Sequence, residues 1–207
     1  LSDMAPPRDR VFTDLARELS EGLITPVLFG SAEHGNGISR LLKSLRHDVP
    51  DVAATAKRVG LEAGNIATAQ IVKTIHTAHG GKLSLARILS GSIQDGTALV
   101  GAKGDEQRVA GLFAMQGQNP VKMAKVEAGE LVALGRLDKF ATGETVALAK
   151  SSPKQLYTNS KSPNVYGFAV SVSDRKDEVK LTSAINKLVD EDPSFALDHN
   201  QDTHEMV

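Results

Sequence analysis

Glycine-bearing turns divide the middle of this sequence into short apolar segments. The segments are rich in Val, Ile, Leu and Thr, and most are too short for ordinary helices. Many short strands separated by regular turns are typical of a β-barrel or a β-sandwich. We therefore predict an all-β domain over residues 65–150. The predicted strands are 67–76, 82–90, 98–100, 108–116 and 130–134, with turns at 80–81, 95–96, 104–105, 128–129 and 142–143.

The first 50 residues have an α/β pattern. Apolar residues recur at helical spacing over 11–19, and Gly22 should end that helix. Residues 24–30 predict a short, buried apolar strand. The apolar residues of 38–45 predict an amphipathic helix, with Asn36 as its N-cap.

Two segments of irregular composition separate the parts of the chain. Residues 51–64 and the Ser- and Pro-containing residues 151–163 are predicted to be linkers. The last part predicts a strand over 164–173, a helix over 174–190 and a hairpin over 195–207. Such a unit without further strands would leave a sheet edge and an apolar helix face uncovered, so we expect a piece of a larger protein.

Composition excludes several classes of protein. The formal net charge of −1 gives no overall signature of nucleic-acid or membrane binding. The chain has no cysteine, which excludes disulfides and thiolate metal sites and fits a reducing compartment. No apolar run is long enough for a membrane-spanning helix, and the N-terminus lacks a signal-peptide pattern. We expect a cytoplasmic location and a monomer.

The run from Pro26 to Gly37 predicts a ligand-binding loop. An apolar strand would end there in the tight loop Gly30-Ser31-Ala32, before a second glycine-rich turn and a helix. Junctions of this kind place backbone N–H groups against nucleotides in α/β domains.

Three stretches of the chain resemble the translation elongation factor G family. They are Thr25-Pro-Val-Leu-Phe-Gly-Ser-Ala, the run Gly81-Lys-Leu-Ser-Leu-Ala-Arg-Ile-Leu-Ser-Gly-Ser-Ile-Gln-Asp-Gly, and residues 165–207 with Glu191-Asp-Pro-Ser-Phe. The resemblance implies that 1–50 is the C-terminal end of an α/β P-loop GTPase domain. It also implies a β-barrel second domain over 65–150 and the start of an α+β, ferredoxin-like third domain over 164–207.

The same resemblance implies a function and a nucleotide site. Relatives use GTP to drive movement of tRNA and mRNA on the ribosome, and the matching loop Gly30, Ser31 and Ala32 would hold the guanine base. GTP or GDP and Mg²⁺ would be bound by the parent protein. The phosphate-binding motif and the Mg²⁺ and water-positioning residues are missing here, so we predict no catalytic residues and no GTP hydrolysis by this chain alone.

Other duties are compatible with the resemblance. After Ala32, relatives often carry an aromatic residue and a Lys-rich turn, whereas this chain has Glu33-His-Gly-Asn-Gly, which indicates a paralogue. Ribosome recycling and ribosome protection of the tetracycline-resistance kind are alternatives to translocation. A non-enzymatic barrel that binds RNA or protein is a further alternative.

The barrel also carries candidate contacts to the ribosome. In relatives this domain touches RNA of the small subunit, and Lys82, Arg87, Arg108 and Lys122 could meet its phosphates. A solubilising surface is the simpler interpretation of any one of them. The low aromatic content of 4% makes base stacking a poor alternative.

Two histidine pairs could in principle hold a metal ion. His76 and His79 have a metal-compatible spacing, and His199 and His204 flank a predicted turn with acidic neighbours. A loop border and a polar cross-strand pair are simpler interpretations. We predict no metal site.

Overall fold

The computed structural model divides the chain into two compact units, Leu1–Ala63 and Gly64–Val207. The described residues are 7–61, 66–77, 81–117, 119–157, 163–200 and 206–207.

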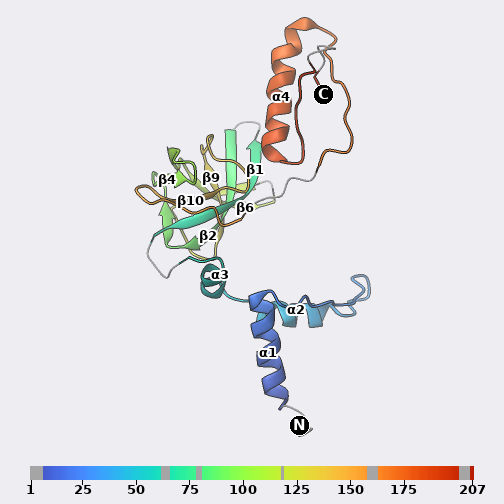
Figure 1. Cartoon of the computed structure of the whole chain (residues 1–207), viewed down its shortest axis with the longest axis vertical. Coiled ribbons are helices and arrows are strands. Elements are labelled where there is room, and N and C mark those ends of the chain that lie inside the picture. Colours follow the sequence, from blue (N-terminus) through green and yellow to red (C-terminus); the bar gives the residue numbers. More distant parts are fainter. Residues whose placement is uncertain (1–6, 62–65, 78–80, 118, 158–162, 201–205) are drawn as a thin grey trace. The chain divides into compact units, whose positions relative to one another are not determined.

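The first unit contains three helices, α1 (Arg8–Glu21), α2 (Ile38–His47) and α3 (Val52–Arg58) (Figure 1). Helix α1 ends where predicted, because Gly22 adopts a φ of 75° and its N–H donates to the carbonyl of Leu19.

Three details of this unit differ from the prediction. Residues 24–30 form no strand, since no described segment pairs with them, and Phe29 is 89% exposed. Gly37, not Asn36, precedes α2, and the Asn36 carbonyl instead accepts a hydrogen bond from the Ser31 N–H. The predicted linker 51–64 contains α3, because the Asp51 carboxylate caps it by accepting from the Ala54 N–H at 2.7 Å.

The second unit is built on antiparallel strands, as the turn pattern predicted. Eight of them form one sheet in the order β5-β4-β10-β1-β2-β9-β6-β7, and β3 pairs with β8. The bounds are β1 (Thr68–Thr77), β2 (Gly81–Ser90), β3 (Ser92–Gln94), β4 (Ala98–Gly101), β5 (Glu106–Arg108), β6 (Leu112–Gln116), β7 (Asn119–Met123), β8 (Lys125–Glu127), β9 (Leu131–Gly135) and β10 (Thr145–Leu148).

Between β5 and β6 the chain passes from one side of the sheet order to the other. These strands belong to opposite sides of the sheet order, yet only residues 109–111 separate them in sequence. Val109 donates to the carbonyl of Thr97 and Ala110 to that of Gly135, each at 3.0 Å. The single strand predicted over 108–116 is therefore wrong, because the chain turns from one neighbour to another at Gly111, whose φ is 96°.

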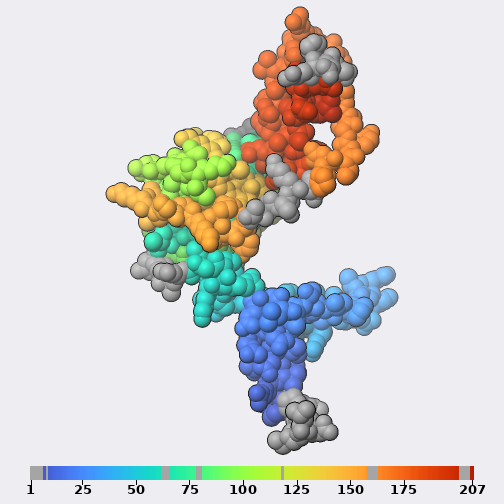
Figure 2. Space-filling model, viewed as in Figure 1, coloured from blue at the N-terminus to red at the C-terminus, as the bar shows by residue number. Residues whose placement is uncertain are grey.

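The core lies on one face of this sheet. Along β2, Ala86 and Ile88 are fully buried and Arg87 between them is exposed, which is the alternation of a strand with one face on a core. In the space-filling view the atoms of the barrel form a continuous mass (Figure 2). The largest fully buried side chains are Phe140, Ile71, Ile88, Ile93, Leu99, Leu112, Leu134 and Leu137.

The segment predicted as a second linker is partly fixed to the barrel. The Gln155 side chain accepts from the Thr145 N–H at 3.1 Å and donates to the carbonyl of Gly143. In return, the Leu156 N–H donates to the Thr145 hydroxyl at 3.0 Å. The chain beyond β10 is thus held along that strand before residues 158–162, which lie outside the described part.

The last part of the chain contains one long helix. A 3-10 turn, η1 (Arg175–Asp177), leads into α4 (Glu178–Glu191). Together they span 175–191, which agrees within one residue with the helix predicted over 174–190. The predicted strand 164–173 is wrong apart from an isolated bridge between Val170 and Met206. Of the predicted hairpin 195–207, a bridge joins His199 to Met206, and residues 201–205 lie outside the described part.

Candidate functional site

The predicted nucleotide loop is shaped by backbone contacts in the first unit. The Ser31 N–H donates to the Asn36 carbonyl at 2.9 Å, so the loop closes on itself. A β-carbon on Gly30 would lie 2.7 Å from that same carbonyl oxygen. Gly37 has a φ of 78°, and a β-carbon there would collide with the carbonyl of Phe29. Both glycines are therefore required by close approach of the backbone.

The loop leaves backbone N–H groups available. Gly30 and Ala32 are exposed and Ser31 is half-buried. Among the described residues, the Ala32 N–H has no backbone acceptor, although the Ala32 carbonyl accepts from Gly35 at 3.3 Å. An exposed N–H on a short, closed loop can donate to a ligand oxygen. The role of Gly30, Ser31 and Ala32 as a guanine site stays a prediction.

The four predicted RNA contacts divide into two kinds. Arg87 on β2, Arg108 on β5 and Lys122 on β7 are exposed. Arg108 donates to the Gly96 carbonyl at 3.4 Å, and it remains accessible. Lys82 differs, because only 5% of its side chain is exposed. Its burial argues against a direct phosphate contact.

Lys82 instead belongs to a polar cluster between the barrel and the end of α4. Its ammonium group donates to the carbonyl of Phe140 at 2.8 Å and lies 3.0 Å from the nearer carboxylate oxygen of Asp190. The same carboxylate is 2.9 Å from Nε2 of His76. His76 and Lys82 are cross-strand partners on β1 and β2, so the hairpin presents both to one carboxylate.

The next residue of α4 is also held by β1. The His76 N–H donates to the carboxylate of Glu191 at 2.5 Å. The Lys73 ammonium donates to the Glu191 carbonyl at 2.9 Å. The C-terminal turn of α4 is thus bound through both side chains and backbone.

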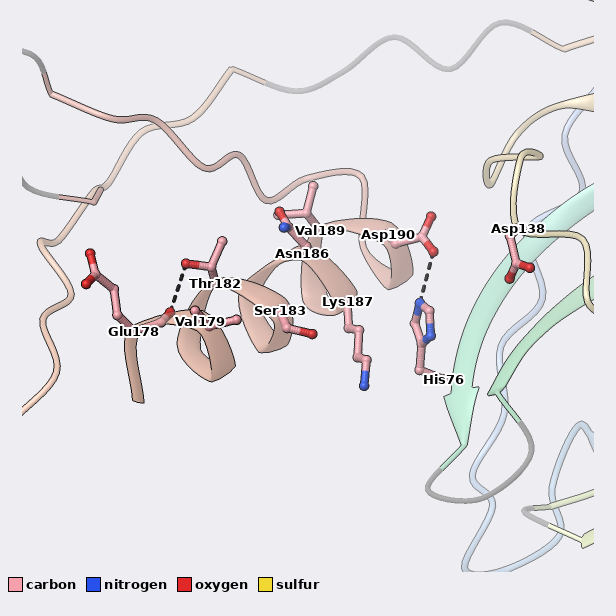
Figure 3. Close-up of a pocket in the computed structure, with 10 residues that line it drawn as sticks. All are labelled: His76, Asp138, Glu178, Val179, Thr182, Ser183, Asn186, Lys187, Val189 and Asp190. Carbon is pink, nitrogen blue, oxygen red and sulfur yellow. Dashed lines mark hydrogen bonds and ion pairs between the residues drawn. The ribbon is translucent and has the colours of Figure 1, made fainter. Parts of the chain in front are cut away.

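A groove of about 970 Å³ runs beside this cluster (Figure 3). His76 and Asp190 point toward each other at one end, and polar side chains of α4 follow along the helix. Asp138 contributes from the barrel. The lining residues are His76, Asp138, Glu178, Val179, Thr182, Ser183, Asn186, Lys187, Val189 and Asp190.

Sequence reasoning missed this cluster. None of the predicted site residues included Asp190, whose carboxylate contacts His76 and Lys82. One signal was available: α4 ends in the acidic run Asp190-Glu191-Asp192, without a basic residue in its last turn. Acidic groups are unfavourable at a helix C-terminus. Such a run therefore indicates a positively charged side chain from another part of the chain.

Each of the two predicted histidine pairs has one member outside the described residues. His76 contacts Asp190, and its partner His79 lies outside the described residues. His204 lies outside them as well. Within the described residues, no group of three or more His, Asp or Glu side chains could hold a metal ion. No described helix has the length and hydrophobicity of a membrane span.

The antiparallel sheet domain and the helical part that follows it each match a known family of domains. The family model for elongation factor G domain 2 matches residues 66–149, and that for elongation factor G domain III matches residues 162–207. The chain belongs to the elongation factor G family.

Individual relatives agree with this assignment. The chain is 38% identical over 211 residues to an elongation factor G-like protein of Synechocystis, covering 100% of this chain and 30% of the relative. It is 26% identical to elongation factor G 1 of Syntrophomonas wolfei, covering 90% of this chain and 29% of the relative. The chain therefore spans about 30% of the length of these relatives.

A solved structure supports the fold. A crystal structure of a protein from Thermus thermophilus matches with a TM-score of 0.77 at 22% sequence identity. The match covers 97% of this chain and 29% of that one.

Proposed function

We propose that this chain is the central part of an elongation factor G-like GTPase that drives tRNA and mRNA movement on the ribosome. The observation that carries the proposal is the order of two matches in one chain, domain 2 at 66–149 and domain III at 162–207. Membership in this family supports a role in translation elongation. The site of action would be the cytoplasm, where the protein would work as a monomer.

In this proposal, residues 1–50 are the end of the GTPase domain. Apolar side chains on α1 and on the segment before the loop are exposed in this chain, among them Phe12 at 58% and Phe29 at 89%. Side chains of this size are usually buried, so they would pack against the rest of that domain. The loop Gly30, Ser31 and Ala32 would then close over the guanine of GTP or GDP, and Mg²⁺ and the phosphates would be held by the rest of the domain.

The nucleotide part of the proposal is tested with two proteins. The full-length protein should hydrolyse GTP in a ribosome-stimulated manner, and the 207-residue chain should show no turnover. In the full-length protein, Gly37→Ala should weaken GDP binding, because the loop could not keep its closure onto Phe29. Gly22→Ala, at a positive φ outside the loop, is the matched control. Equal GDP affinity of the two variants would contradict a role of the loop in nucleotide binding.

The barrel would dock on RNA of the small ribosomal subunit. Arg87, Arg108 and Lys122 are exposed cations that could each neutralise one phosphate. Co-sedimentation of the chain with small subunits should weaken as salt rises. Replacing any one of the three by Ala should lower the slope of log K against log salt by about 1. Lys180→Ala on α4 is the control, and equal slopes for all variants would exclude these three contacts.

Translocation is distinguished from other ribosome duties with the full-length protein. In a pretranslocation complex, the protein should move tRNA only when GTP is present. Reactivity of the peptidyl-tRNA with puromycin measures this movement. If the protein instead separates the subunits of post-termination complexes without moving tRNA, the recycling function replaces translocation.

A further inference from the structure

Helix α4 ends in a charge arrangement that is unfavourable for the helix alone. Its last residues, Asp190 and Glu191, and the following Asp192 are acidic, and the last turn has no basic residue. The negative end of the helix dipole repels carboxylates at this position. The shorter helices α2 and α3 end in basic residues, as the dipole favours. Local conflicts of this kind are expected where a residue serves another purpose.

The barrel supplies the missing cations. Lys82 and His76 face Asp190 as cross-strand partners, and Lys73 donates to the backbone of Glu191. Hydrogen bonds from Ser194 lower the pKa of Asp192 most, and the charge of Lys73 lowers it further. Positive groups on β1 and β2 therefore neutralise the end of a helix that belongs to the following domain.

The hydrogen bonds and ion pairs described above join the barrel to the end of the helix. Helix α4 has no buried residues, and Val179 near its start is 80% exposed. The groove lies along the remaining length of the helix (Figure 3). An attachment made by ions and hydrogen bonds, without a buried apolar interface, can be broken without exposing a core.

Lys82, which α4 covers, has hydrogen-bond acceptors within the barrel as well. Lys82 donates to the carbonyl of Phe140 at 2.8 Å and lies 3.4 Å from that of Asp138, both within the barrel. If α4 moved away, water could replace Asp190 at the remaining position of the ammonium group. If Lys82 had no acceptors within the barrel, release of Asp190 would leave a buried charge without a partner. That state is very costly, so the helix would stay bound.

We propose that Asp190 is the centre of a reversible latch by which the β1–β2 hairpin of the barrel holds the C-terminal turn of α4. Lys82 and His76 bind its carboxylate, and Lys73 secures the adjacent backbone. The latch fixes the direction of α4 relative to the barrel when closed. Its release lets the helix turn away while the barrel stays folded.

The test measures the distance between the barrel and α4 in the 207-residue chain. Because the sequence has no cysteine, Lys103→Cys on the barrel and Ala184→Cys on α4 can carry two spin labels without further changes. Both positions are exposed. Pulsed electron–electron double resonance then gives the distribution of the distance between the labels.

The wild-type chain should show one dominant distance. Asp190→Asn should shift the ratio of docked to undocked helix by about tenfold or more, because charged hydrogen bonds are lost. Lys73→Ala should shift the ratio of docked to undocked helix in the same direction, but by less. Because the Lys73 side chain is exposed, its removal should leave the barrel unchanged. Asp198→Asn is the matched control, since it removes one exposed carboxylate elsewhere in the same part of the chain.

Circular dichroism and the amide spectrum of the barrel should be unchanged in all three variants. The proposal is overturned if Asp190→Asn and Lys73→Ala give the same distribution as Asp198→Asn. A wild-type distribution as broad as that of Asp190→Asn would also overturn it. If Asp190→Asn unfolds the barrel, the carboxylate is part of the core and not a latch, and Lys73→Ala would then leave the distance unchanged.

Discussion

The carboxylate of Glu144 fills the space beside Gly101 that a β-carbon would occupy. A β-carbon at Gly101 would collide with Oε1 of Glu144 and would lie 3.1 Å from the ring of Phe140. Glu144 is only 8% exposed, and its other oxygen accepts from the Ala141 N–H at 3.1 Å. The glycine is therefore required by a neighbouring side chain and not by a turn.

Gly101→Ala should destabilise the barrel. The carboxylate cannot retreat without losing its hydrogen bond, so overpacking should lower the free energy of unfolding by about 1–3 kcal/mol. Urea unfolding followed by circular dichroism measures this change. Gly167→Ala is the control, because its β-carbon would meet only the flexible end of Val207. Equal stability of the two variants would contradict the predicted collision.

Phe140→Ala should be among the most damaging substitutions in the core. The Phe140 ring is fully buried, and its removal leaves a cavity in the cluster that also contains Leu137 and Leu99. We expect a loss of about 3–5 kcal/mol in the free energy of unfolding. Phe29→Ala, at an 89% exposed position, should change it by less than about 0.5 kcal/mol. Urea titrations of both variants make the comparison, and a loss below about 1 kcal/mol for Phe140→Ala would contradict the packed barrel core.

Gln155→Ala should release the segment that follows β10. The side chain bonds to the Thr145 N–H and the Gly143 carbonyl, and the neighbouring Leu156 N–H bonds to the Thr145 hydroxyl. Without the Gln155 amide, the amide protons of Thr145 and Leu156 should exchange with solvent faster. Hydrogen exchange measured by NMR is the readout. Lys154→Ala, at an exposed neighbouring position, should leave both rates unchanged.

Asp192 should titrate below the ordinary range of an aspartate. Its carboxylate accepts from the Ser194 N–H at 2.9 Å, and this bond lowers its pKa more than the nearby Lys73 does. A lowered pKa in the folded state means that the charged form adds stability at neutral pH. That contribution is lost as the pH falls through the lowered pKa. Carbon-13 NMR of the carboxyl group should give this titration, and an unshifted midpoint would contradict the turn at Ser194.

Much of the fold follows from local patterns. The glycine turns and the alternation along β2 predict the strands of the barrel because these signals act between neighbouring residues. The end of α1 at Gly22 is predicted for the same reason, since a left-handed residue stops a helix locally. The strand expected over 24–30 did not form, because a strand requires a partner that no local pattern supplies.

The candidate sites divide in the same way. The Gly30-Ser31-Ala32 loop is visible in the sequence, and its closure between Ser31 and Asn36 is a short-range contact. The role of Lys82 is not visible, because its charge alone cannot distinguish a surface cation from a buried one. Only pairing of β1 with β2 brings Lys82 beside His76.

The sequence by itself determined the barrel, its turns, the α4 helix and the family resemblance, since each rests on residues close together in the chain. The tertiary structure alone decided that the chain turns at Gly111 from one strand neighbour to another and that Asp190 meets Lys82. The physical reason is sequence separation: Lys82 and Asp190 lie 108 residues apart, and no local propensity encodes which distant charges become partners.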